Sequence, residues 1–80
     1  MPIRAIKGAT TVSVDSAREI CVATAELLHA MLSENALRVE HVVSLMLTAT
    51  PDLRSEFPAR GARDAGWGEV PMPCAQEIDV

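Results

Sequence analysis

The chain has 80 residues, seven of them Lys or Arg and eleven Asp or Glu, so its net charge at neutral pH is −4. This acidic balance argues against a nucleic-acid partner, because neutralising phosphates takes an excess of clustered Lys and Arg. No apolar stretch approaches the roughly 20 residues of a membrane span, and the N-terminus MPIRAIKG lacks the apolar run of a signal peptide.

Residues 1–80 are expected to form a single small domain whose core needs support from outside the chain. Cys21 and Cys74 lie far apart and the histidines are only His29 and His41, which gives neither a disulfide framework nor a metal-site spacing. Association with other subunits is therefore the expected support. Free thiols without an export signal favour a reducing cytoplasm.

The first predicted elements are a short strand and a long helix. Ile3–Lys7 alternates between apolar and polar residues as a strand does. Ser16 and Glu19 have the spacing of a capping box, with Asp15 as a competing N-cap, and Asn35 is a suitable stop. The apolar stripe expected on this helix consists of Ile20, Ala23, Thr24, Leu27, Leu28, Met31 and Leu32.

The second half of the chain predicts a strand, a short helix and a final extended segment. Val42–Leu47 is a continuous apolar run of strand length, ended by the break at Pro51. Pro58 suits the first turn of a short helix that runs to Arg63 and is closed by Gly66. Val70–Val80 reads as extended, and its prolines restrict it to an edge or irregular strand.

Basic side chains suggest an anion site. Arg60 and Arg63 are three residues apart and share a helix face, and Lys7 ends the first predicted strand. Guanidinium groups bind carboxylates with two parallel hydrogen bonds. The alternative interpretation is that both arginines only solvate a surface helix.

Cys74 and Glu77 fall in the last extended segment. A cysteine nucleophile needs a base nearby, and neither His29 nor His41 has a suitable spacing, so Cys74 is expected to be buried and inert. Glu77 is either at a solvated strand end or an acceptor in a site. Phe57 is either core or a lid over a ligand, and Trp67 between two glycines is expected to anchor packing at a turn.

Four segments together resemble one enzyme family: KGATT at 7–11, TATPDL at 48–53, FPA with a following arginine at 57–63, and PMPCAQEIDV at 71–80. They are similar to the monofunctional, trimeric (AroH-class) chorismate mutases. The resemblance implies an α+β fold of the bacillus type, in which a mixed β-sheet packs on one long helix plus a short helix. It also implies a trimeric pseudo-barrel with active sites between subunits, and further C-terminal strands that residues 1–80 lack.

The implied reaction is the [3,3] rearrangement of chorismate to prephenate, which feeds phenylalanine and tyrosine synthesis and uses no cofactor. Such a pericyclic step needs the dicarboxylate held in a compact conformer and a cation or donor at the breaking ether oxygen. In this resemblance Glu77 accepts a hydrogen bond from the ring hydroxyl, with Cys74 beside it. The other implied substrate contacts come from Lys7, Phe57, Ala59, Arg60, Arg63, Pro73, Ala75 and Gln76.

The sequence departs from the family pattern in two ways. Lys7 stands where the family has arginine before GATT, so a weaker grip on the substrate is expected. The family's cation at the ether oxygen and a tyrosine at a carboxylate have no counterpart in residues 1–80, which predicts low or absent activity for this chain. The alternatives are a non-catalytic trimeric module that binds small anions, and an enzyme of the similarly shaped imine-deaminase superfamily.

Overall fold

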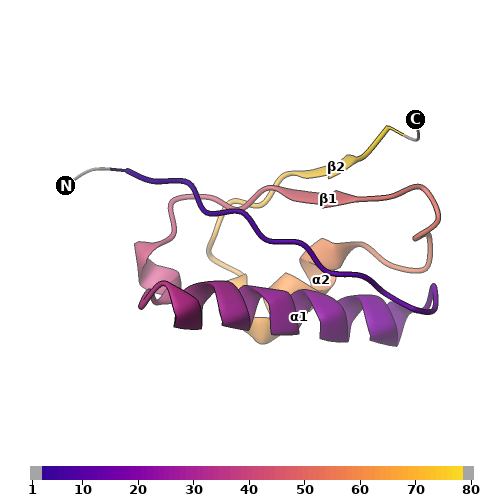
Figure 1. Ribbon diagram of the computed structural model, residues 1–80, viewed down its shortest axis with the longest axis horizontal. Coiled ribbons are helices and arrows are strands. Elements are labelled where there is room, and N and C mark those ends of the chain that lie inside the picture. The colour runs from indigo at the N-terminus through magenta and orange to yellow at the C-terminus, as the bar shows by residue number, and fades with distance from the viewer. Residues whose placement is uncertain (1–2, 79–80) are drawn as a thin grey trace.

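The computed structural model describes residues 3–78, which form a layer of helices beside a two-stranded parallel sheet (Figure 1). The elements are helix α1 (Ala17–Glu34), a 3₁₀ turn η1 (Val39–His41), strand β1 (Leu47–Ala49), helix α2 (Pro58–Ala62), a π-type turn η2 (Arg63–Trp67) and strand β2 (Cys74–Gln76). This agrees with the predicted α+β class of one long helix, one short helix and strands. No helix in the described range is long and apolar enough to cross a bilayer.

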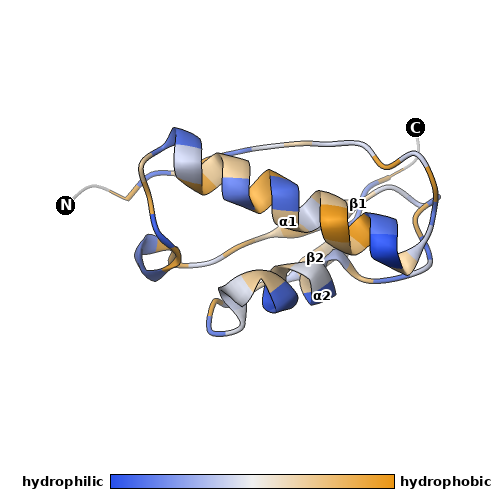
Figure 2. Cartoon of the chain, turned by 90° about the horizontal axis from the view of Figure 1, so that it is seen from below, coloured by the Kyte–Doolittle hydropathy of each residue, from blue (hydrophilic) through white to orange (hydrophobic). Residues whose placement is uncertain are grey.

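Helix α1 begins and ends where the sequence predicts. The Ser16 side chain accepts a hydrogen bond from the Glu19 backbone N–H at 3.1 Å, which satisfies one of the free donors of the first turn. At the other end Asn35 is the C-cap, and its side chain donates to the Met31 carbonyl at 2.7 Å. Ile20, Thr24 and Leu28 are the buried positions, spaced four apart on one face. Figure 2 shows the alternation of hydrophilic and hydrophobic residues that results along α1.

The core lies where α1, α2 and the turn after α2 meet. Its buried apolar side chains are Ile20, Leu28, Ala59, Ala62, Trp67 and Val70, of which Leu28, Ala62, Trp67 and Val70 form one cluster. Trp67 is 5% exposed and anchors the turn as predicted, and Gly66 beside it has φ of 102°, a conformation that side chains with a Cβ rarely adopt. Partly buried apolar side chains surround this cluster: Met31, Leu32, Val39, Val42, Leu45, Leu47 and Met72.

The two strands pair in parallel, but the pairing starts later than the apolar run predicts. β1 covers Leu47–Ala49 rather than Val42–Leu47, in register with Cys74–Gln76. Upstream, the backbone N–H groups of Leu45 and Leu47 still donate to the carbonyls of Pro71 and Pro73. Proline cannot donate in return, so the ladder is one-sided there and becomes regular only beyond Pro73. The prolines therefore shorten the paired part of both strands, and the last segment is an irregular strand as predicted.

The expected N-terminal strand does not form. Residues Ile3–Lys7 are exposed and carry no strand assignment, and Ile3 is 86% exposed. The chain then passes close to α1 at Gly8, where a Cβ would come within 2.8 Å of the Met31 sulfur. The alternation within Ile3–Lys7 is real, yet the segment has no backbone partner among residues 3–78. Residues 79–80, the end of the predicted last strand, lie outside the described residues.

Helices α1 and α2 approach closely at one glycine. A Cβ built on buried Gly61 would lie 2.8 Å from both the Cα and the carbonyl oxygen of Cys21. Backbone atoms cannot swing aside as a flexible side chain can, so only glycine allows this separation of the helices. Gly68, in contrast, has helical dihedral angles and open space around its Cα.

We therefore predict that Gly61→Ala lowers the free energy of unfolding by about 1–3 kcal/mol, because the added methyl group forces the two helices apart. The matched control is Gly68→Ala, which should be neutral or stabilise by up to about 1 kcal/mol through the unfolded chain. Urea unfolding at one fixed protein concentration measures both values. Equal stabilities of the two variants would contradict this account of the helix contact.

Candidate active site

The main cleft lies at the edge where both strands end. Parallel strands bring their carboxyl ends to the same edge of a sheet, and ligands commonly bind there. Here β1 ends at Ala49 and β2 at Gln76, and the segment 50–58 leaves β1 and returns to α2. The resulting cleft has a volume of about 490 Å³. Its wall is made of Leu47, Thr48, Ala49, Thr50, Pro51, Leu53, Arg54, Ser55, Glu56, Phe57, Pro58, Cys74, Ala75 and Gln76.

Asp15 fixes the outer part of this wall. Its carboxylate oxygen Oδ1 accepts hydrogen bonds from the backbone N–H groups of Arg54 at 2.9 Å and Ser55 at 3.0 Å. The Ser55 hydroxyl donates in turn to the Asp15 carbonyl at 2.9 Å. The N–H of Ser55, followed by that of Arg54, holds the pKa of Asp15 below its ordinary value. Asp15, predicted as a rival N-cap, thus ties the chain just before α1 to the cleft wall 39 and 40 positions later.

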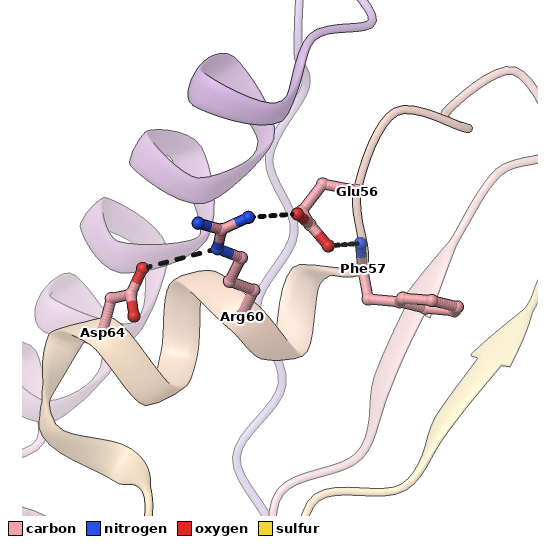
Figure 3. Close-up of polar contacts among 4 residues, drawn as sticks. All are labelled: Glu56, Phe57, Arg60 and Asp64. Carbon is pink, nitrogen blue, oxygen red and sulfur yellow. Dashed lines mark hydrogen bonds and ion pairs between the residues drawn. The ribbon is translucent and has the colours of Figure 1, made fainter.

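Glu56 and Arg60 form the shortest ion pair among the described residues. One oxygen of Glu56 accepts from Arg60 Nη1 at 2.8 Å, and the other accepts from the Phe57 backbone N–H at 2.9 Å. Arg60 also faces Asp64 at 4.0 Å (Figure 3). The bond to Arg60 lowers the pKa of Glu56, and the same bond raises the pKa of Arg60. Arg60 is therefore neutralised by carboxylates of its own chain.

The structure brings part of the expected site together. Phe57, Cys74, Ala75 and Gln76 all line the cleft. Phe57 is 70% exposed, and its ring points away from Arg60 (Figure 3), so within one chain it belongs to the cleft wall rather than to the core. Cys74 is exposed, which contradicts the expectation of a buried thiol, because β2 is uncovered along its whole length.

The remaining expected residues lie outside the cleft of the single chain. Lys7, Arg63 and Pro73 are exposed, and Ala59 is 6% exposed within the core. Glu77 is exposed just after β2, where its backbone N–H donates to the Ala49 carbonyl at 2.8 Å. For Lys7, Arg63 and Glu77, no ion pair within 4.0 Å occurs among residues 3–78.

Sequence reasoning missed Arg54, which lines the cleft. Its side-chain Nε donates to the Pro51 carbonyl at 3.1 Å. A local signal was present, since a basic residue following a proline turn between a strand and a helix lies on the loop that borders the strand ends. What places Arg54 on the wall, however, is the distant contact with Asp15, which no spacing reveals.

The arrangement of one long and one short helix beside two parallel strands has a close counterpart among solved structures. The chorismate mutase from Clostridium thermocellum superposes with a TM-score of 0.85 and 42% identity, over 89% of this chain and 63% of that chain. The sequence profile of the family described as chorismate mutase type I matches residues 3–80. The chain belongs to this family.

Two characterised relatives agree. Chorismate mutase AroH of Bacillus subtilis (strain 168) is 48% identical over 81 residues, an alignment that covers the whole of this chain and 64% of the relative. Chorismate mutase AroH of Thermus thermophilus is 42% identical over 79 residues, covering 98% of this chain and 65% of the relative. The chain thus spans slightly less than two thirds of the length of these relatives.

The Asp15 contact gives a pH-dependent prediction. A carboxylate whose pKa is lower in the folded than in the unfolded chain stabilises the fold above the unfolded value, here 3.8, and loses that contribution as the pH falls through the folded value. Asp15→Asn keeps an oxygen acceptor but removes the charge. Its stability should therefore fall less than that of the wild type between about pH 6 and about pH 3.

Urea midpoints measured across this range test the difference in slope. Asp52→Asn is the matched control, because Asp52 is an exposed carboxylate of the same segment with no hydrogen bond recorded among residues 3–78. It should keep the wild-type slope. If the stability of Asp15→Asn depends on pH as steeply as that of the wild type, the proposed role of this carboxylate is wrong.

Proposed function

We propose that this protein is a chorismate mutase, catalysing the [3,3] rearrangement of chorismate to prephenate in cytoplasmic phenylalanine and tyrosine synthesis. The observation that carries the proposal is the 48% identity to an AroH chorismate mutase over the whole chain, together with one cleft lined by Phe57, Cys74, Ala75 and Gln76, four of the residues that the family resemblance implies. The active form would be a homotrimer, and each active site would lie between two protomers.

The chemistry suits this set of residues. Chorismate is a flexible dianion, and its rearrangement breaks one C–O bond and forms one C–C bond without a nucleophile, an acid or a base. The protein must hold the compact conformer and balance charge on the ether oxygen, which positioning and fixed charges achieve. Lys7 and Arg63 would attract the carboxylates, Phe57 would pack against the ring, and Glu77 would accept a hydrogen bond from the ring hydroxyl beside Cys74.

An inter-subunit site would explain why some expected residues lie apart from the cleft of one chain. Lys7, Arg63 and Glu77 are exposed and carry no ion pair within the described chain, so each can contact a ligand or a second protomer. Val43 and Met46, just before β1, are 71% and 70% exposed, so their apolar side chains are available to a second protomer.

The alternative is a non-catalytic trimeric module that binds a small anion in the same cleft. It is favoured by Lys7 in place of the family arginine. We expect residues 1–80 alone to be slower than the same chain with any residues that its gene encodes after Val80.

The direct test is to follow chorismate loss and prephenate formation with both forms of the protein. Turnover should exceed the uncatalysed rate in the longer form, and Glu77→Ala should lower kcat/KM by about tenfold to a hundredfold through the lost charged hydrogen bond. Glu69→Ala, an exposed carboxylate outside the cleft, is the control and should leave kcat/KM unchanged. Prephenate binding without turnover would instead establish the anion-binding module.

A second prediction concerns Lys7. Lys7→Arg should lower the KM for chorismate by a few-fold, because a guanidinium binds a carboxylate through two hydrogen bonds where an ammonium acts as a point charge. Arg4→Lys, which alters an exposed residue of the same N-terminal segment, should not change KM. A KM of Lys7→Arg at or above the wild-type value would argue against a carboxylate contact at this position.

A further inference from the structure

The charge inside the cleft comes from two side chains. Of its wall residues, only Arg54 and Glu56 are charged. The Glu56 side chain is 19% exposed and its charge is matched by Arg60 at 2.8 Å, outside the wall. The pair is close to neutral as a whole, so the cation that the cleft presents to a ligand is Arg54.

Arg54 is held in a way that leaves its outer donors available. Its backbone N–H is bound to Asp15, and its Nε is bound to the Pro51 carbonyl at 3.1 Å. Among residues 3–78, neither a hydrogen bond nor an ion pair occupies its two terminal nitrogens. The bond at Nε orients the planar group, and a guanidinium oriented in advance loses less freedom when it binds a carboxylate.

Arg60 provides the contrast within the same segment. Its guanidinium contacts the carboxylates of Glu56 and Asp64, so a ligand would have to displace a partner before binding it. The carboxylate of Asp15 contacts Arg54 as well, but it accepts from the backbone N–H of Arg54 rather than from its guanidinium. The charge of Arg54 is only the last of the causes that lower the pKa of Asp15. Arg54 thus remains largely uncompensated.

We propose that Arg54 is a further substrate-binding residue of this cleft, which takes one carboxylate of a small dicarboxylic acid through its terminal nitrogens. The proposal rests on the proposed function for the identity of the dicarboxylate, namely chorismate or prephenate. Binding of the substrate carboxylates would then involve Arg54 on the turn after β1, in addition to Lys7 and Arg63. The proposal also gives Asp15 a role in binding, because Asp15 holds the backbone from which Arg54 reaches the cleft.

The test compares Arg54→Gln and Arg54→Lys with Arg18→Gln, which makes the same change of net charge at an exposed position of α1 outside the cleft. Arg54→Gln should raise the KM for chorismate about tenfold with kcat nearly unchanged, as expected when a contact is equally strong in ground and transition states. The KM of Arg54→Lys should lie between those of the wild type and Arg54→Gln, since lysine keeps the charge but cannot form two parallel hydrogen bonds to a carboxylate. Arg18→Gln should match the wild type.

A binding measurement separates failure of this proposal from failure of the proposed function. Malonate is titrated into isotope-labelled protein, and the amide signals of residues 50–58 and 74–76 are followed. In wild type and Arg18→Gln these signals should shift with a shared affinity, which Arg54→Gln should lose. This holds even for a protein that does not turn over chorismate. Equal malonate affinity in Arg54→Gln and Arg18→Gln would overturn the proposal, whether or not the protein turns over chorismate.

Discussion

The close contact between α1 and α2 is the constraint on which the cleft depends. Gly61 lies against the backbone of Cys21, so α2 has one fixed distance from α1. The position of α2 sets where Pro58 begins the helix and where Phe57 enters the cleft wall. Asp15, just before α1, holds the other side of the same segment. Both ends of the segment that forms the cleft wall are thus positioned by contacts that lead back to helix α1.

The helices were predictable because their signals are local. Ser16 and Asn35 bound α1 and Pro58 starts α2, and Gly66 takes the left-handed conformation in the turn η2 that follows α2. The strands were less so. The position of β1 is decided by which backbone groups of residues 71–77 can pair, and the prolines there lie far away in the sequence. Ile3–Lys7 shows the limit of periodicity, since alternation without a partner forms no strand.

The candidate site was predictable only in part, for a related reason. Phe57 and the run Cys74–Gln76 were found through the resemblance to a family, and the structure brings them to one cleft. Arg54 was missed, because its place on the wall depends on Asp15 across the fold. The pairing of Glu56 with Arg60 was not predicted, and it removes Arg60 from the set of free cations.

The parallel pairing of β1 and β2 has one more consequence. Both strands end at a common edge of the sheet, so the segment after Ala49 and the residues Cys74–Gln76 border one cleft although they are far apart in the sequence. Few of these positions contribute to the buried cluster around Trp67. A change of charge at these positions would alter which small molecules are attracted, while the buried cluster around Trp67 would keep its contacts. Ligand preference in this architecture can thus diverge independently of the scaffold that carries it.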